Sequence, residues 1–146
     1  MKGVQIIRKN AYNLVKVEGF LDAKTPESRQ LLEVLEMPIE KMSVDYVFDL
    51  ERVEYINSSM LGAFVQFLST AEQALHRIII YNPPFSVENV LNMTGLCELL
   101  PVVRSEAEIL NHLRQAPEKK LPAGEVKYDV LADEIDVVGV TEDVQS

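Results

Sequence analysis

Residues 46–75 combine a strand pattern with a helix pattern, and this pairing constrains the fold more than any other part of the sequence. Residues 46–50 are apolar and rich in strand formers, which predicts a buried strand, and residues 51–56 are expected to form a connector. Apolar residues then recur at the spacing of one helix face. They are Leu61, Phe64, Val65, Leu68, Ala71 and Leu75. The segment therefore predicts the strand–loop–helix unit of an α/β domain.

Three consecutive residues at the junction of this unit favour the position that precedes a helix: Asn57, Ser58 and Ser59. A side-chain oxygen there accepts hydrogen bonds from the free backbone N–H groups of the first turn. The positive end of the helix dipole also favours an added phosphate. We therefore expect the helix to begin with a hydroxyl pair in which the Ser58 oxygen is reachable from solvent.

The segments before this unit predict a hairpin and a helix. Residues 4–8 and 12–18 are short apolar or alternating runs joined by a turn-like segment, which is typical of a β-hairpin. Thr25 is suited to cap a helix that begins at Pro26, because proline at the first helical position loses no hydrogen bond. This helix is expected to end at about Met37, before Pro38.

The segments after the unit predict a further buried strand, two helices and a short last strand. Residues 78–81 are wholly apolar, as in strands buried on both faces. Ser86 is suited to cap a short helix, and Gly95 to end it. Residues 99–103 favour a short strand, and residues 105–108 a capping box that starts the terminal helix. The expected fold is α/β, with about four helices covering a mixed sheet of about four to five strands.

Composition narrows the possible functions. The 146 residues suit one domain, and the net charge of −9 argues against nucleic-acid binding, which needs a basic face. The first residues lack a signal-peptide pattern, and no apolar run approaches membrane-spanning length, so we expect a cytoplasmic protein without membrane insertion. The single cysteine, Cys97, excludes an internal disulfide and predicts no metal cluster. No glycine-rich phosphate loop is present, and no cofactor is expected.

The character of the chain changes near residue 115. Residues 115–146 hold eight acidic residues and three lysines, and a linker-like stretch precedes an alternating apolar pattern. We expect a domain at residues 1–114 and an acidic C-terminal extension at residues 115–146. The extension is either a linker with a flexible tail or a segment that forms a short strand or hairpin.

Four segments together resemble the STAS domain of bacterial anti-sigma factor antagonists. GFLDAKTPE at 19–27 is similar to the family's G-x-L-D-x-x-T stretch. VFDLERVEYINSSMLG at 47–62 is similar to its D-L-x-x-V-x-x-I-D-S-S-G-L-G signature. Residues 78–96 resemble its late strand and the helix ending in T-G-L, and the capped terminal helix also fits. The resemblance covers about residues 1–114.

The resemblance implies a partner-switching role without catalysis. The unphosphorylated protein would bind an anti-sigma factor that is also a GHKL-type serine kinase, and a serine phosphatase would reset the cycle. By position, Ser58 would be the phosphoacceptor, with Ser59 as second choice. The implied partner-binding residues are Asp22, Thr25, Asn57, Ser58, Ser59 and Met60.

Two departures from the family pattern keep another function open. Asn57 stands where the family usually has aspartate, and Met60 where it usually has glycine. Asparagine still caps well, but it lacks the carboxylate, and methionine adds bulk beside the hydroxyl. The alternative is a non-phosphorylated STAS scaffold, similar to a stressosome component or to the partner of a lipid-transport ABC complex. An enzyme is disfavoured because no acid–base pair is evident, while a monomer and a homodimer both stay open.

Overall fold

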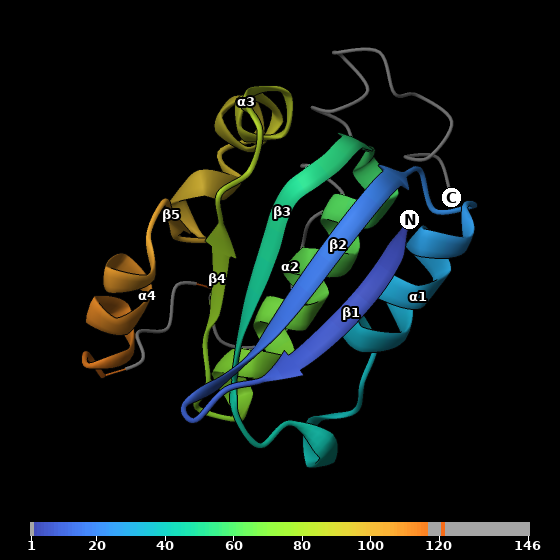
Figure 1. Cartoon of the computed structure of the whole chain (residues 1–146). Coiled ribbons are helices and arrows are strands. Elements are labelled where there is room, and N and C mark those ends of the chain that lie inside the picture. Colours follow the sequence, from blue (N-terminus) through green and yellow to red (C-terminus); the bar gives the residue numbers. More distant parts are fainter. Residues whose placement is uncertain (1, 117–120, 122–146) are drawn as a thin grey trace.

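The computed structural model describes residues 2–116 and 121, which form a five-stranded mixed sheet with four α-helices (Figure 1). The strands are β1 (Gly3–Arg8), β2 (Tyr12–Leu21), β3 (Asp45–Ile56), β4 (Ile78–Tyr81) and β5 (Val102–Val103). The helices are α1 (Pro26–Leu35), α2 (Ser58–Gln73), α3 (Phe85–Thr94) and α4 (Glu106–Leu113). This is the predicted α/β architecture, with the elements in the predicted order.

The strands lie in the order β1-β2-β3-β4-β5. β1 pairs antiparallel with β2, as predicted for a hairpin, and the other neighbouring pairs are parallel. The C-terminal ends of β2, β3 and β4 therefore meet at one edge of the sheet, where connections to helices form binding sites in many open α/β sheets.

The predicted connector at 51–56 is wrong, because these residues continue β3. They pair with the second half of β2, from Glu18 opposite Arg52 to Leu21 opposite Ile56. The register shifts twice along this stretch, so the apolar residues do not alternate regularly. Val53 and Ile56 are nevertheless buried in the core. The longer strand carries its end, and hence the start of α2, to the same edge as the end of β2.

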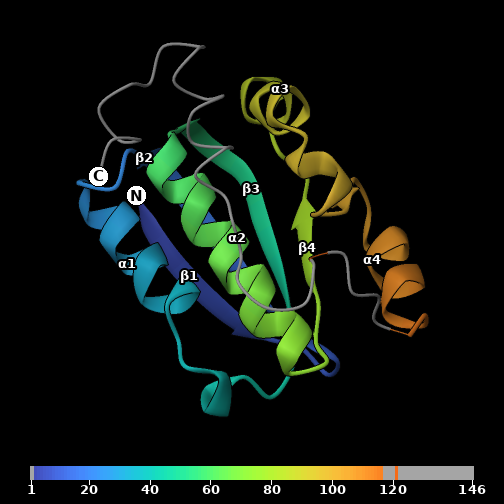
Figure 2. The ribbon, with the colours of Figure 1, turned by 180° about the vertical axis from the view of Figure 1, so that it is seen from behind.

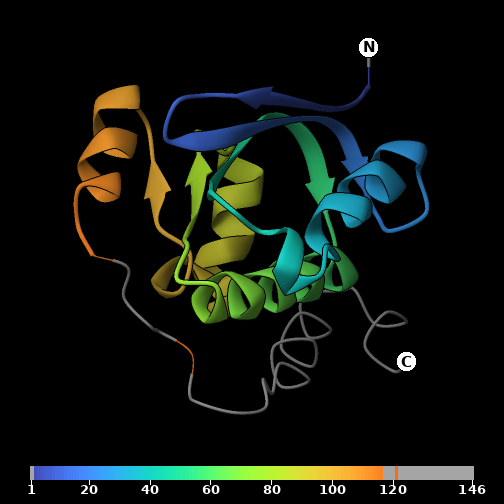
Figure 3. The ribbon, with the colours of Figure 1, turned by 90° about the horizontal axis from the view of Figure 1, so that it is seen from below.

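The helices cover the two faces of the sheet unequally (Figures 2 and 3). The main core lies between the sheet and α1, α2 and α3, and its centre holds Phe48 of β3 against Phe64 and Phe67 of α2. α4 packs on the opposite face, where Ile109 joins a smaller apolar cluster with Tyr12, Val47, Ile79 and Val103. Beside α4, the same face carries polar side chains of β1 and β2, among them Gln5, Lys16 and Glu18.

Several predicted helix ends are confirmed. Thr25 caps α1 by accepting a hydrogen bond from the Ser28 backbone N–H at 3.1 Å. Gly95 ends α3 with a φ of 78°, a conformation that glycine adopts without strain. The capping box of α4 joins Ser105 and Glu108 in both directions.

Two details of the helices differ from the predictions. Pro84, not Ser86, precedes α3, because the two prolines fix the extended backbone two residues earlier, and no side chain caps this helix. Leu75 lies beyond α2, with a φ of 62° and 70% of its surface exposed, and so does not belong to the helix's core face.

Most of the acidic extension lies outside the described residues, so its predicted strand, hairpin or flexible tail is not described. Leu121 is an exception. It is half-buried and packs against the main core, and its backbone N–H donates to Glu72 Oε1 at 3.3 Å. None of the helices in the described part of the chain has the length and apolar character that a bilayer crossing requires.

Candidate functional site

The predicted site residues gather where β2 and β3 end, at the upper edge of the sheet in Figure 1. β2 leads into the loop 22–25 before α1, and β3 leads through Asn57 into α2. We call this edge the switch edge and define it by residues 22–25 and 57–60. Two segments that are distant in sequence thus lie side by side.

Asn57 joins the two segments. Its backbone N–H donates to the Leu21 carbonyl at 3.0 Å, and its side-chain Nδ2 donates to the Asp22 carbonyl at 2.9 Å. Its Oδ1 accepts from the Met60 backbone N–H at 3.1 Å, which is the predicted helix cap. Asn57 is itself buried, with 4% of its surface exposed. The cap was predictable from sequence, but the bond to Asp22 was not, because it depends on how the two loops meet.

The loop 22–25 is held by its own polar groups. Asp22 Oδ1 accepts from the backbone N–H groups of Lys24 at 2.8 Å and Thr25 at 3.0 Å. The bond from Lys24, with a smaller contribution from Thr25, lowers the pKa of the Asp22 carboxyl below its ordinary value. Ala23 adopts a φ of 78°, which is rare for a residue with a side chain. The loop therefore carries local strain that the surrounding bonds must offset.

Thr25 stabilises this loop through the hydrogen bonds of its side chain. Its hydroxyl lies 2.6 Å from the Phe20 carbonyl and 2.8 Å from Ser28 Oγ, and it also accepts the capping bond of α1. Ser28, which sequence reasoning missed, is fully buried and accepts from the Ala23 backbone N–H at 3.1 Å. The only sequence signal for this residue is its place three positions after the cap, where it meets the turn that precedes α1.

The prediction that the Ser58 oxygen is reachable from solvent is wrong. Ser58 is 4% exposed, its Oγ is sealed from solvent, and it has no hydrogen-bond partner among the described residues. Asn57, not Ser58, is the cap, so Ser58 already lies in the first turn of α2 and turns inward. A buried hydroxyl without a partner costs about 1–3 kcal/mol of folding free energy, so other interactions of the first turn must offset this cost.

Met60, which the resemblance implies as a partner-binding residue, lies in the interior of the fold. It is completely buried and belongs to the main core, because its place in the first turn of α2 directs it toward the sheet. Ser59 lies on the other side of this turn and is half-buried. It lines a cavity of about 280 Å³ between α1 and α2, together with Ala23, Leu32, Glu36, Met60, Ala63 and Gln66.

The six predicted partner-binding residues therefore form two layers. Asp22, Thr25 and Ser59 are half-buried and reach the surface. Asn57, Ser58 and Met60 lie beneath them. In this conformation only the first layer is accessible from solvent.

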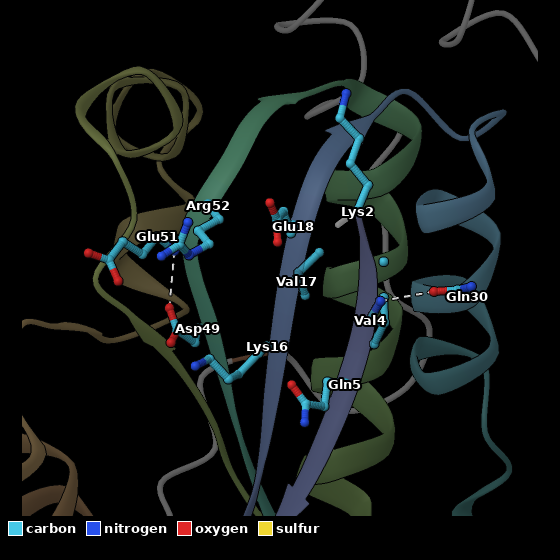
Figure 4. Close-up of a pocket in the computed structure, with 11 residues that line it drawn as sticks. Lys2, Val4, Gln5, Lys16, Val17, Glu18, Gln30, Asp49, Glu51 and Arg52 are labelled. Carbon is cyan, nitrogen blue, oxygen red and sulfur yellow. Dashed lines mark hydrogen bonds between the residues drawn. The ribbon is translucent and has the colours of Figure 1, made fainter.

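A second, larger cavity of about 580 Å³ lies on the open face of β1, β2 and β3, away from the switch edge (Figure 4). Lys16, Asp49 and Arg52 extend from β2 and β3 at its centre, and Asp49 Oδ1 accepts from the Glu51 backbone N–H at 3.1 Å. Three cationic and three acidic side chains line it, so it favours neither sign of charge. No residue of the switch edge takes part.

The described residues contain no group of three or more His, Cys, Asp or Glu side chains placed to hold a metal ion. His76 has a structural contact instead: its Nδ1 lies 3.2 Å from Asp45 Oδ1, and the same oxygen accepts from the Arg77 backbone N–H at 2.9 Å. These contacts fix the loop between α2 and β4 at the far end of the sheet.

Comparison with known proteins gives a family match and several structures of the same fold. The model of the STAS domain family matches residues 8–109. A putative anti-sigma factor antagonist from Thermotoga maritima is 19% identical, with a TM-score of 0.64 over 77% of this chain and 95% of its own. The anti-sigma factor antagonist SpoIIAA in its unphosphorylated form is 21% identical, with a TM-score of 0.63 over 77% and 96%. No curated protein matches the sequence significantly.

A third similar structure is an anti-sigma factor antagonist (STAS) domain protein from Planctomyces limnophilus. It is 16% identical, with a TM-score of 0.61 over 77% of this chain and 99% of its own. At these identities the structures establish a common fold, while the family match covers most of the described chain.

Proposed function

Since this chain belongs to the STAS domain family, we propose that it acts as an anti-sigma factor antagonist. Its role is regulated protein binding rather than catalysis. The partners are an anti-sigma factor that is also a GHKL-type serine kinase, and a serine phosphatase that resets the cycle. Phosphorylation of Ser58 releases the kinase. The similar structures described as anti-sigma factor antagonists support this proposal.

The observation that carries the proposal is the meeting of the two loops at the switch edge. The Asn57 amide lies 2.9 Å from the Asp22 carbonyl, so residues far apart in sequence form one surface at the start of a 16-residue helix. A protein docked on Asp22 and Ser59 would sit directly over Ser58. The Ser58 hydroxyl would then lie beneath the docked protein.

The effect of a phosphate follows from charge. Phosphorylation adds about −1.5 to −2 charges at neutral pH. The free N–H groups at the start of α2 favour this charge once the first turn has opened. The same charge must be desolvated in a docked face, and a loss of about 3 kcal/mol there weakens binding more than a hundredfold. A phosphate charge that the helix start favours but a docked partner disfavours suits a binding switch.

The burial of Ser58 adds a condition to this mechanism. A kinase must bring the hydroxyl within reach of ATP, so the first turn of α2 has to open before phosphate transfer. The unpartnered Oγ makes this opening less costly than its burial suggests, because the hydroxyl regains water.

The same burial favours a second candidate function, a non-phosphorylated STAS scaffold. A hydroxyl that is sealed from solvent is a poor kinase substrate if the first turn of α2 never opens. The chain would then bind a partner through the switch edge constitutively, as a subunit of a larger complex.

Intact-mass analysis distinguishes the two functions. We expect the full chain, incubated with ATP and a GHKL-type kinase encoded near it, to gain one phosphate. Ser58→Ala should abolish the gain, and the matched variant Ser59→Ala should retain it. Peptide mapping then places the phosphate.

If the phosphate is still added to Ser58→Ala but not to Ser59→Ala, the phosphoacceptor is Ser59. The phosphorylation proposal fails if no candidate kinase adds phosphate to the full chain while one of them binds it stably, a result that favours the scaffold.

A further inference from the structure

We propose that the Asn57 side chain is a latch that keeps the loop 22–25 closed over the first turn of α2 and so withholds Ser58. Only its consequence for phosphorylation rests on the proposed function. The latch itself is a property of this chain's geometry, and its function is to make Ser58 available conditionally.

The first step is that one side chain closes both segments. Asn57 Nδ2 donates to the Asp22 carbonyl of the loop at 2.9 Å, while its Oδ1 accepts from the Met60 N–H of the helix at 3.1 Å. The two ends of the amide thus tie the loop to the first turn. Because Asn57 is 4% exposed, water competes weakly for these bonds.

The second step is that the closed state needs such a tie. Ala23, in the middle of the loop, has a strained φ of 78°, and Ser58 Oγ is buried without a partner. Opening would relieve both. Ala23 lines the same cavity as Ser59 and Met60, so the loop faces the first turn of α2 across this space, and a displaced loop would widen the opening beside Ser58.

The third step is that the latch requires an amide. An ionised aspartate has acceptors only, so it can cap α2 but cannot donate to the Asp22 carbonyl. A carboxylate at residue 57 would instead place an oxygen near that carbonyl oxygen, which is repulsive. Asn57→Asp therefore keeps the cap, removes the tie and leaves side-chain size unchanged.

Hydrogen exchange tests the latch without any partner. In the full chain, Asn57→Asp should make the backbone amides of Ala23, residue 57 and Met60 exchange about tenfold faster. The amides of Ile79 and Ile80, in the core of the sheet, should be unchanged. Asn57→Ser, which can cap but adds no charge, should give the same direction and so separates the lost donor from the added charge. Asn92→Asp, on the exposed side of α3, is the matched control.

A thiol probe reads the exposure of residue 58 directly. Ser58→Cys is made in a Cys97→Ala background, so that one thiol remains, and its reaction with an excess of a maleimide is followed by intact mass. We expect slow labelling with Asn57 and about tenfold faster labelling after Asn57→Asp.

Equal exchange rates in the three amides, or equal labelling rates with and without Asn57→Asp, would overturn the latch. Faster exchange across the whole sheet would also overturn it, because Asn57 would then support global stability instead. Neither readout uses a kinase. The latch can therefore fail while the proposed function stands, and the absence of phosphorylation would not affect these measurements.

Discussion

Replacing Phe48 by alanine is expected to lower the free energy of unfolding by about 3–5 kcal/mol. Phe48 is completely buried, and its ring meets Phe64 edge-on at a centroid distance of 5.1 Å and Phe67 at 5.8 Å. The substitution removes the ring from the contact between β3 and α2 and leaves a cavity. Urea unfolding followed by circular dichroism measures the change.

The matched control is Phe85→Ala, because Phe85 is 83% exposed at the start of α3. Its removal should change the free energy of unfolding by less than about 0.5 kcal/mol. Equal losses for the two variants would mean that the aromatic cluster is not the centre of the core.

Replacing Gly19 by alanine should cost about 3 kcal/mol or more of folding free energy. Gly19 has a φ of 130°, a region that side chains rarely enter, and an added Cβ would lie 2.7 Å from Glu27 Cδ. Glu27 is buried and its Oε2 accepts from the Phe20 N–H at 2.9 Å, so it cannot move aside without losing that bond. Thermal and urea unfolding measure the loss.

Gly95→Ala separates the collision from the backbone strain. Gly95 also has a positive φ, 78°, but nothing lies within 4 Å of an added Cβ. We expect a loss of about 1 kcal/mol there. If the two glycine variants lose equal stability, the close approach of Glu27 adds nothing to the cost of a side chain at residue 19.

The order of the elements and several of their ends could be predicted because they depend on local chemistry. The apolar run before α2 and the helical spacing after it set the alternation of strand and helix. Thr25 with Pro26, Gly95, and Ser105 with Glu108 act on neighbouring backbone groups, so their roles are visible in a short window of sequence.

The parts that were missed depend on contacts between distant segments. Residues 51–56 extend β3 only because β2 lies alongside them. Ser58 is buried because Asn57 takes the cap, which places Ser58 in the first turn of α2. A serine next to a helix start looks the same in sequence whether it faces water or the core, and the second bond of Asn57 needs a partner 35 residues away.

The most direct test of the central claim measures binding at the switch edge. Isothermal titration of the full chain with the proposed GHKL-type kinase partner, without ATP, is compared for Ser59→Arg and Ser69→Arg. Both serines are half-buried on α2, Ser59 at its start and Ser69 about 15 Å further along the helix. Circular dichroism confirms that both variants are folded.

An arginine at the switch edge should block the docked face, whereas one near the far end of the same helix should not. We expect Ser59→Arg to weaken binding at least a hundredfold and Ser69→Arg to change it less than about twofold, where a hundredfold is about 2.7 kcal/mol. Equal affinities for the two variants would contradict the assignment of this edge as the partner-binding surface.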